Sequence, residues 1–171
     1  MVSMTRPADR DNDCGLYQVR PAARDDAATI WRFVEASEQL DRNSYYCYVV
    51  LTELFPATCL IAQDHAARSV GFVTAVPTPE RPGELFVWQL YVDLAERGRG
   101  VGMMLLRAAV QAAGVTVVRA TVVPRSQAAL STFTALARHM GAPLTVVPYL
   151  SSADFPPEAG AHQGEDMITI G

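Results

Sequence analysis

The chain has 171 residues, of which 50% are hydrophobic and 19% are charged, and its formal net charge is −4. This length suits a single domain with a sizeable core, and an acidic balance without any basic run argues against a nucleic-acid partner. Apolar stretches fall short of the roughly 18 residues of a membrane span, and the amino-terminal MVSMTRPADRDNDCG has no apolar signal core, so we expect a cytoplasmic protein without a membrane partner.

The first third of the chain is predicted to be a tail, a strand and two helices. Residues 1–15 are polar and charged, which is typical of a disordered tail, so we expect one domain over residues 16–171. Asp25 or Asp26 can cap the first helix, and the DRNS segment separates it from the second. The expected elements are a strand at Tyr17–Arg20, a helix from Ala27 to about Leu40 and a helix at Tyr45–Phe55.

The rest of the chain reads as strands first and then as alternating helices and strands. The segment ELFVWQLYV is apolar nearly throughout, so we expect it to be a central strand buried on both faces. The expected elements are strands at Thr58–Gln63, Ser69–Val76 and Glu84–Val92, a helix at Met103–Gly114, a strand at Thr116–Val123, a helix capped by Ser126 that ends at Gly141, and strands at Pro143–Leu150 and Asp166–Ile170.

The cysteines give no sign of a disulfide framework or of a metal site. Cys14, Cys47 and Cys59 are odd in number and form no CxxC pair, so we expect no metal. Cys47 and Cys59 lie in apolar runs and are predicted to be core residues.

The segment RGRGVG (Arg97–Gly102) stands between the strongest strand and an apolar helix. Glycines let a backbone approach a ligand closely, and the free N–H groups of a helix N-terminus attract anions, so this order of elements predicts a phosphate site. Arg97 and Arg99 could add positive charge. The P-loop lysine is missing, and Met103 stands where a dinucleotide fingerprint needs glycine. A glycine-rich turn without any ligand is the plainer alternative.

The pattern of Arg97, Gly100 and Gly102 after a strand that ends in Tyr-Val-Asp resembles the pyrophosphate-binding motif of the Gcn5-related N-acetyltransferases. The resemblance implies an α/β fold whose mixed, mostly antiparallel central sheet is flanked by helices, with the fourth and fifth strands splayed apart. It also implies acetyl-coenzyme A as co-substrate, with the pantetheine arm between those strands. The cofactor-binding residues that it implies are Leu90, Tyr91, Val92, Arg97, Gly98, Arg99, Gly100, Val101, Gly102 and Ser126.

Several longer segments are similar to the diaminobutyrate acetyltransferases of ectoine synthesis, and the likeness covers about residues 17–171. They are LDRNSYYCYVVL, ATCLIA, ELFVWQLYV, ATVVPRSQAALSTF and HQGEDMITIG. The resemblance implies acetylation of the side-chain (4-) amine of L-2,4-diaminobutyrate. It places six residues in the substrate pocket: Asp41, Asn43, Tyr46, Trp88, His162 and Glu165. The reacting amine must lose a proton, and we expect Glu165 or His162 to be the catalytic base. A two-fold homodimer through the apolar segment after Gly141 is also expected.

Each of these side chains also has a plainer interpretation. Asp41 could be a solvated helix end, Tyr46 and Trp88 core aromatics, and His162 and Glu165 surface residues. Arg20 and Arg42 are candidate partners for the substrate carboxylate, although arginines are usually solvated.

Two departures from the family pattern leave other functions open. Phe133 stands where many members have a tyrosine that protonates the leaving thiolate, and Ser126 stands where the subfamily usually has asparagine. The alternatives are an acetyltransferase for another small amine or a protein N-terminus, and a non-catalytic sensor of coenzyme A.

Overall fold

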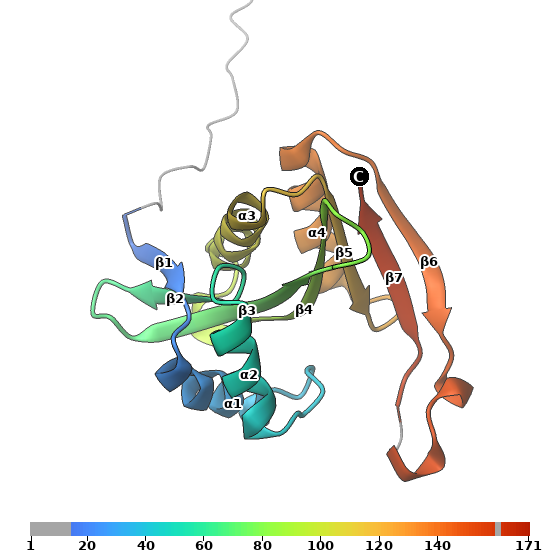
Figure 1. Cartoon of the computed structure of the whole chain (residues 1–171), viewed down its shortest axis with the longest axis horizontal. Coiled ribbons are helices and arrows are strands. Elements are labelled where there is room, and N and C mark those ends of the chain that lie inside the picture. Colours follow the sequence, from blue (N-terminus) through green and yellow to red (C-terminus); the bar gives the residue numbers. More distant parts are fainter. Residues whose placement is uncertain (1–14, 160–161) are drawn as a thin grey trace, which may run out of the picture.

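The computed structural model describes residues 15–159 and 162–171, so the predicted tail lies almost wholly outside the described residues. Seven strands form one sheet in the order β1-β2-β3-β4-β5-β7-β6 (Figure 1). The strands are β1 Tyr17–Pro21, β2 Leu60–Asp64, β3 Ser69–Pro77, β4 Glu84–Val92, β5 Val117–Val122, β6 Leu144–Leu150 and β7 Glu165–Ile170. The α-helices are α1 Ala27–Ala36, α2 Tyr45–Leu54, α3 Val101–Ala113 and α4 Gln127–Met140, and short 3-10 turns include η1 Arg24–Asp26 and η2 Leu94–Glu96. The order of helices and strands confirms the predicted fold.

The sheet opens between its fourth and fifth strands. All neighbouring strands are antiparallel except β4 and β5, which pair in parallel over only Glu84–Val87 and Val117–Ala120. Beyond these residues β4 continues alone on that side, while β5 stays paired with β7. The predicted splay of the two strands is therefore confirmed.

A bulge in β4 begins where this opening begins. In the register with β3, Thr74 faces Gln89 and Ala75 faces Val87, so Trp88 is an extra residue in β4. Such an insertion changes which face each following side chain takes. Trp88 is 42% exposed. The expectation that β4 is buried on both faces is therefore wrong for its second half, where Trp88 is exposed and Leu90, Tyr91 and Val92 are only partly buried.

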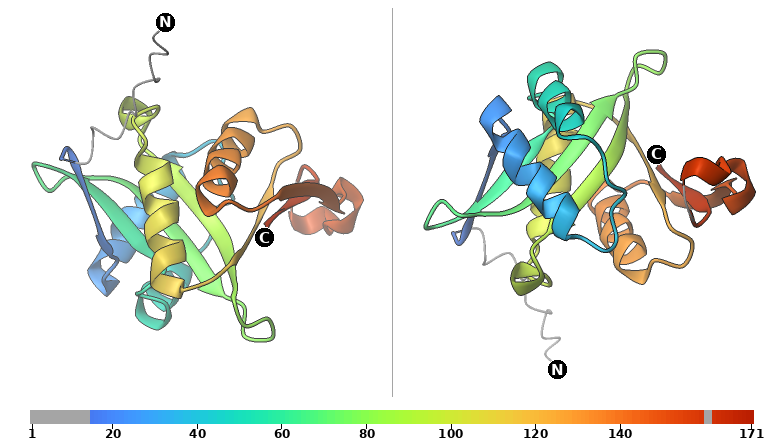
Figure 2. Two further views of the ribbon diagram at one scale, coloured as in Figure 1. Left: turned by 90° about the horizontal axis from the view of Figure 1, so that it is seen from above. Right: turned by 90° about the horizontal axis from the view of Figure 1, so that it is seen from below.

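The helices cover both faces of the sheet and enclose two cores. Helices α3 and α4 lie on one face, and α1 and α2 lie on the other (Figure 2). Leu105, Leu106 and Leu136 anchor the first core, and Ile30 and Tyr48 anchor the second. The aromatic rings of Phe33, Phe72 and Tyr91 stack in the second core, with centroids 5.0–6.3 Å apart.

Two predicted caps take different roles from those expected. Helix α1 ends at Ala36, about four residues early, and its N-cap Asp26 makes no side-chain capping bond. The Asp26 carboxylate instead accepts from the N–H of Ala23 and from Arg20. Ser126 is the N-cap of α4 by position, but its hydroxyl makes no capping bond either.

Two smaller expectations concern burial and membrane contact. Cys59 is fully buried, as predicted, whereas Cys47 is only partly buried on α2. Within the described ranges, no helix is both long and apolar enough to cross a membrane.

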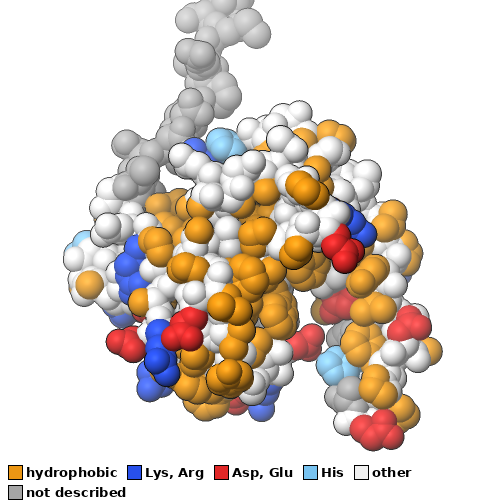
Figure 3. All heavy atoms as spheres, viewed as in Figure 1, with side chains coloured by type: hydrophobic (Ala, Val, Ile, Leu, Met, Phe, Trp, Pro, Cys, Tyr) orange, Lys and Arg blue, Asp and Glu red, His pale blue; other side chains and the backbone are white. Residues whose placement is uncertain are grey.

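Strands β6 and β7 form an arm that stands out from the rest of the molecule (Figure 1). Strand β6 is the last strand of the sheet, and most of its side chains are exposed. Among them Val146, Val147, Tyr149 and Leu150 are 36–55% exposed, and hydrophobic side chains are visible along the arm in Figure 3.

Candidate active site

The glycine segment forms the turn that was predicted to bind phosphate. Gly98 and Gly100 have φ values of 76° and 82°, in the left-handed region that favours glycine. Gly100 is the N-cap of α3, so the first N–H groups of the helix emerge at this turn without intrahelical acceptors. Together with the helix dipole they make the turn suitable for a phosphate group.

Gly102 lies within ordinary contact distance of the end of β4. It lies within α3, where an added Cβ would sit 3.6 Å from Val92 Cγ2 and 3.8 Å from Leu90 Cδ2. Val101 beside it is 1% exposed and anchors the same turn in the core. The start of α3 therefore packs directly against the open end of β4.

The buried carboxylate of Glu96, which the sequence did not reveal, lies next to the glycine turn and links it to other parts of the fold. Glu96 accepts a hydrogen bond of 2.6 Å from the Tyr17 hydroxyl and one of 2.7 Å from Arg68. Arg99 lies 3.5 Å from the same carboxylate. The hydrogen bond from Tyr17 is the main reason why the pKa of Glu96 is lowered, so the group stays ionised. Strand β1 and the β2–β3 turn are thereby tied to the turn.

The other arginine of the motif turns back onto β4. The Nε of Arg97 donates to the carbonyl oxygen of Val92 at 3.0 Å, and its guanidinium lies 6.0 Å from the centre of the Tyr91 ring. Leu90, Tyr91 and Val92 pair with β3 on one side and lie beyond the last β4–β5 pair on the other. This edge of β4 is therefore open to strand-like hydrogen bonding with an extended ligand.

Residues from distant parts of the chain meet across the cleft between the body and the arm. Asp41 follows α1, and His162 and Glu165 lie at the start of the strand that returns along the arm. His162 Nδ1 is 3.9 Å from Asp41 Oδ1. Burial raises the pKa of Glu165, and the charge of Asp41 raises it further, while a hydrogen bond with Thr121 acts in the opposite direction. Figure 3 shows a histidine and acidic side chains at this cleft.

The predicted residues Asp41, His162 and Glu165 are thus brought together, and contacts with neighbouring residues hold His162 and Asp41. The ring of Phe155 stacks on that of His162 at 4.6 Å between centroids. The side-chain amide of Asn43 donates to the carbonyl oxygen of Asp41 at 3.2 Å. A contact between Phe155 and a residue seven positions later in a loop leaves no periodic sequence signal, so the sequence pattern did not predict it.

The two predicted aromatics are surface residues and not core residues. Tyr46 is 72% exposed on α2, and Trp88 is 42% exposed at the bulge of β4. The plainer interpretation, that they fill the core, is therefore wrong.

The two arginines considered for a substrate carboxylate differ in their surroundings. Arg20 makes a two-point ion pair with Asp26, with distances of 2.6 and 2.8 Å, and Arg42 lies 3.9 Å from Glu35. The structure therefore gives no support to Arg20, whose hydrogen-bonding groups are used elsewhere.

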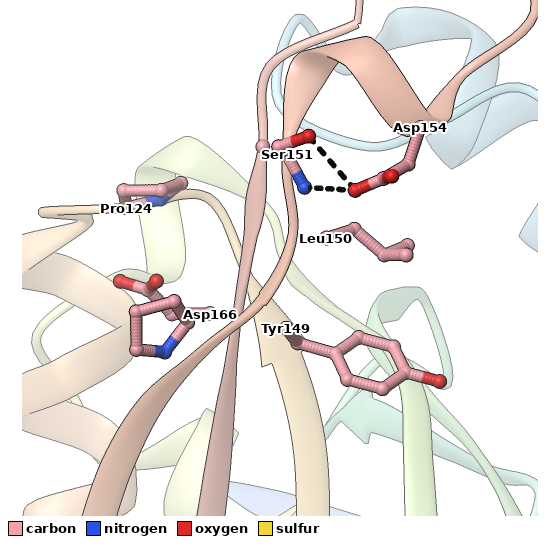
Figure 4. A pocket seen from close by; sticks show the side chains of 8 residues that line it. Pro124, Tyr149, Leu150, Ser151, Asp154 and Asp166 are labelled. Atoms are coloured by element: carbon pink, nitrogen blue, oxygen red, sulfur yellow. Dashed lines mark hydrogen bonds between the residues drawn. The ribbon is translucent and has the colours of Figure 1, made fainter.

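A separate hollow of about 460 Å³ lies beside the arm (Figure 4). Pro124, Leu150 and Asp166 are among the residues that line it. Neighbouring strand residues face opposite sides, so Glu165 points away from a hollow that Asp166 lines. Asp154 at its rim already accepts hydrogen bonds from the N–H and the hydroxyl of Ser151. This hollow is not the predicted site.

Comparison with known proteins gives three kinds of match. The model of the acetyltransferase (GNAT) family matches residues 20–137. An L-2,4-diaminobutyric acid acetyltransferase from Nocardia farcinica is 38% identical over 91% of this chain and 80% of its own length. The same enzyme from Bordetella parapertussis is 36% identical over 99% of this chain and 90% of its own.

Solved structures agree with these matches. The diaminobutyrate acetyltransferase EctA of Paenibacillus lautus, in complex with L-2,4-diaminobutyric acid and coenzyme A, is 32% identical, with a TM-score of 0.83 over 91% of this chain and 94% of that one. Ard1 of Thermoplasma volcanium has a TM-score of 0.68 at 17% identity over 91% of this chain and 95% of its own, which shows a shared fold alone.

Proposed function

The chain belongs to the acetyltransferase (GNAT) family and, within it, to the L-2,4-diaminobutyric acid acetyltransferases, and we propose that it acetylates the side-chain amine of L-2,4-diaminobutyrate in ectoine synthesis. The acetyl donor is acetyl-coenzyme A. The observation that carries this proposal is the opening of the sheet after Val87, in a structure that also has a glycine turn suited to phosphate at the start of α3 and brings Asp41 to His162.

The coenzyme would follow the open edge of β4. The turn at Gly98–Gly102 receives the diphosphate on its backbone N–H groups, with Arg97 and Arg99 adding positive charge nearby. The pantetheine arm hydrogen-bonds along Leu90–Val92. This order brings the thioester to the opening where β5 leaves β4. Ser126, at the start of α4, is the remaining proposed contact.

The amino acid would enter from the side of the arm. The carboxylate of Asp41 suits an α-ammonium group, and Asn43 supports the same segment. We assign the exposed rings of Tyr46 and Trp88 to contacts with the acceptor. A side-chain ammonium with a pKa near ~10 is protonated at neutral pH, so it must lose a proton before it can attack.

Glu165 is the residue we propose as the base, with His162 beside it. A carboxylate whose pKa is raised by burial is a better proton acceptor than an exposed one. Glu165 first takes one proton from the ammonium group, and the neutral nitrogen then attacks the thioester carbon. The second proton of that nitrogen passes to solvent as the tetrahedral intermediate collapses. The proposed donor to the tetrahedral oxyanion is the N–H of Val92 and not that of Tyr91, because the Tyr91 backbone faces β3; the C–S bond then breaks.

The thiolate of coenzyme A leaves without a tyrosine to protonate it. Phe133 is 4% exposed and packs in the core, so the position that many relatives in the superfamily use carries no proton. We propose that the thiolate departs as such or takes a proton from solvent.

A panel of acceptor amines tests the function. Release of coenzyme A is measured with L-2,4-diaminobutyrate, spermidine and a peptide with a free N-terminus. We expect diaminobutyrate to give the highest kcat/KM by a wide margin. A faster reaction with spermidine or the peptide would refute the acceptor, and tight coenzyme binding without turnover of any amine would support a sensor instead.

We further propose that two copies associate through β6 in the cytoplasm. This edge strand exposes Val146, Val147 and Tyr149, and an exposed apolar edge invites pairing. Light scattering of the purified protein is expected to give twice the mass of one chain, and Val147→Asp is expected to lower it. A monomer at all concentrations would refute the proposal.

A further inference from the structure

Gln89 is a buried polar side chain that lies one residue after the bulge of β4. It is 5% exposed, and its backbone N–H donates to the hydroxyl of Thr74 at 3.2 Å. Its position is therefore fixed by the same irregularity that ends the pairing of β4 with β5.

The side chain of Gln89 joins β4 to the segment between α1 and α2. Its Nε2 donates to the carbonyl oxygen of Asp41 at 2.8 Å, and its Oε1 accepts from the hydroxyl of Tyr48 at 3.0 Å. Tyr48 is fully buried, and its hydroxyl also accepts from Asn43 at 3.4 Å. These hydrogen bonds join β4 and α2 to the segment that carries Asp41.

Asp41 needs such support because packing does not provide it. Its side chain is 74% exposed, and the residues around it form no helix or strand. Two amide donors, from Gln89 and Asn43, meet at its carbonyl oxygen. Because these hydrogen bonds fix the carbonyl, they fix the backbone conformation of Asp41. The backbone conformation in turn directs the Asp41 side chain toward His162.

We propose that Gln89 is a positioning residue for the amino-acid acceptor: through the carbonyl of Asp41 it aims the Asp41 carboxylate into the cleft. The proposal rests on the acceptor role given to Asp41 above. Gln89 acts on the acceptor and not on the coenzyme, because its side chain contacts the α1–α2 segment and not the glycine turn. A purely structural role would instead lower stability without favouring one substrate.

The first test compares the two KM values of Gln89→Leu, which keeps the side-chain volume and removes the donor. We expect the KM for diaminobutyrate to rise about tenfold, the factor that one ordinary hydrogen bond is worth, while the KM for acetyl-coenzyme A stays within about twofold. Equal changes in both constants, or no change in either, would overturn the proposal.

Two further variants control for folding. Tyr48→Phe keeps the hydrogen bond from Gln89 Nε2 to Asp41 and removes the one that Gln89 Oε1 accepts. We therefore expect a smaller rise in the KM for diaminobutyrate. This variant replaces Gln89→Leu if Gln89→Leu does not fold. Thr52→Val removes a buried hydroxyl of α2 that bonds only to carbonyls of its own helix in the described residues, so it should leave the ratio of the two KM values unchanged.

Hydrogen exchange separates this inference from the proposed function. Amides of residues 38–44 should exchange faster in Gln89→Leu than in the unmodified protein, whether or not any amine is acetylated. Unchanged exchange with an active enzyme would refute the role of Gln89 alone. Faster exchange in a protein that does not acetylate diaminobutyrate would refute the proposed function, but it would still support the role of Gln89 in holding the Asp41 segment.

Discussion

Gly71 on β3 faces the part of β4 on which the coenzyme is proposed to lie, and Gly71→Ala is the most direct way to move that strand. Gly71 pairs with Val92, and a Cβ built on it would stand 2.6 Å from the carbonyl oxygen of Tyr91. Ordinary contact begins at about 3.4 Å, so β3 and β4 must separate locally by about 0.8 Å. The atom in the way belongs to the backbone and cannot rotate aside.

The cost of Gly71→Ala follows from this displacement. Overpacking a buried site typically costs about 1–3 kcal/mol of unfolding free energy. A misplacement of about 1 Å in a reacting pair can cost about 100-fold in rate, so we expect kcat/KM to fall by roughly 10- to 100-fold. The affinity for free coenzyme A should change less, because the turn at Gly98–Gly102 is not moved.

The assay for Gly71→Ala combines urea denaturation, calorimetry with coenzyme A and release of coenzyme A from the acetylated form. Gly15→Ala is the matched control, since a Cβ there meets nothing within 4 Å. A folded Gly71→Ala protein with an unchanged kcat/KM would show that the Tyr91 backbone does not hold the reacting thioester, and the reasoning would fail.

Three more outcomes follow from the site. Glu165→Gln should lower kcat by at least about 100-fold while calorimetry shows unchanged coenzyme affinity, because the variant accepts no proton; a fully active variant removes Glu165 from the mechanism. The apparent pKa on the acid side of the kcat–pH profile should be higher than that of an ordinary glutamate, because the pKa of Glu165 is raised. Asp41→Asn removes a negative charge that contributes to this rise, so it should move that apparent pKa to lower pH. A shift to higher pH would contradict this. Gly100→Val should abolish coenzyme binding, since a branched side chain is strained at a φ of 82°, with an unchanged circular dichroism spectrum as the check on folding; retained affinity would remove the diphosphate from this turn.

The sequence was informative wherever a single element carried its own pattern. The glycine turn and the helix after it were placed because φ-permissive residues and an apolar stripe lie next to one another in the chain. The interruption between the first two helices was likewise visible in DRNS. The sequence predicted the strand β4 but not its bulge. The bulge at Trp88 depends on how β3 pairs with β4, and the residues of β4 alone give no signal of it.

Contacts between distant residues were beyond the reach of pattern alone. Glu96 looks like an ordinary surface acid until Tyr17 and Arg68 are brought to it by the sheet. Gln89 belongs to a segment typical of the subfamily, but only the fold shows that its amide reaches Asp41. The expected cap by Ser126 was wrong in detail because position at a helix start does not dictate where a hydroxyl turns.

The hydrogen bond between Tyr17 and Glu96 spans 79 positions of the chain and ends at the edge strand farthest from the arm. Thermodynamic linkage works in both directions: if an occupied turn is more rigid, β1 must become harder to detach by the same free energy. The rate of proteolytic cleavage near the amino terminus would then fall as the coenzyme site becomes occupied, although the cleaved segment lies far from the proposed substrate site.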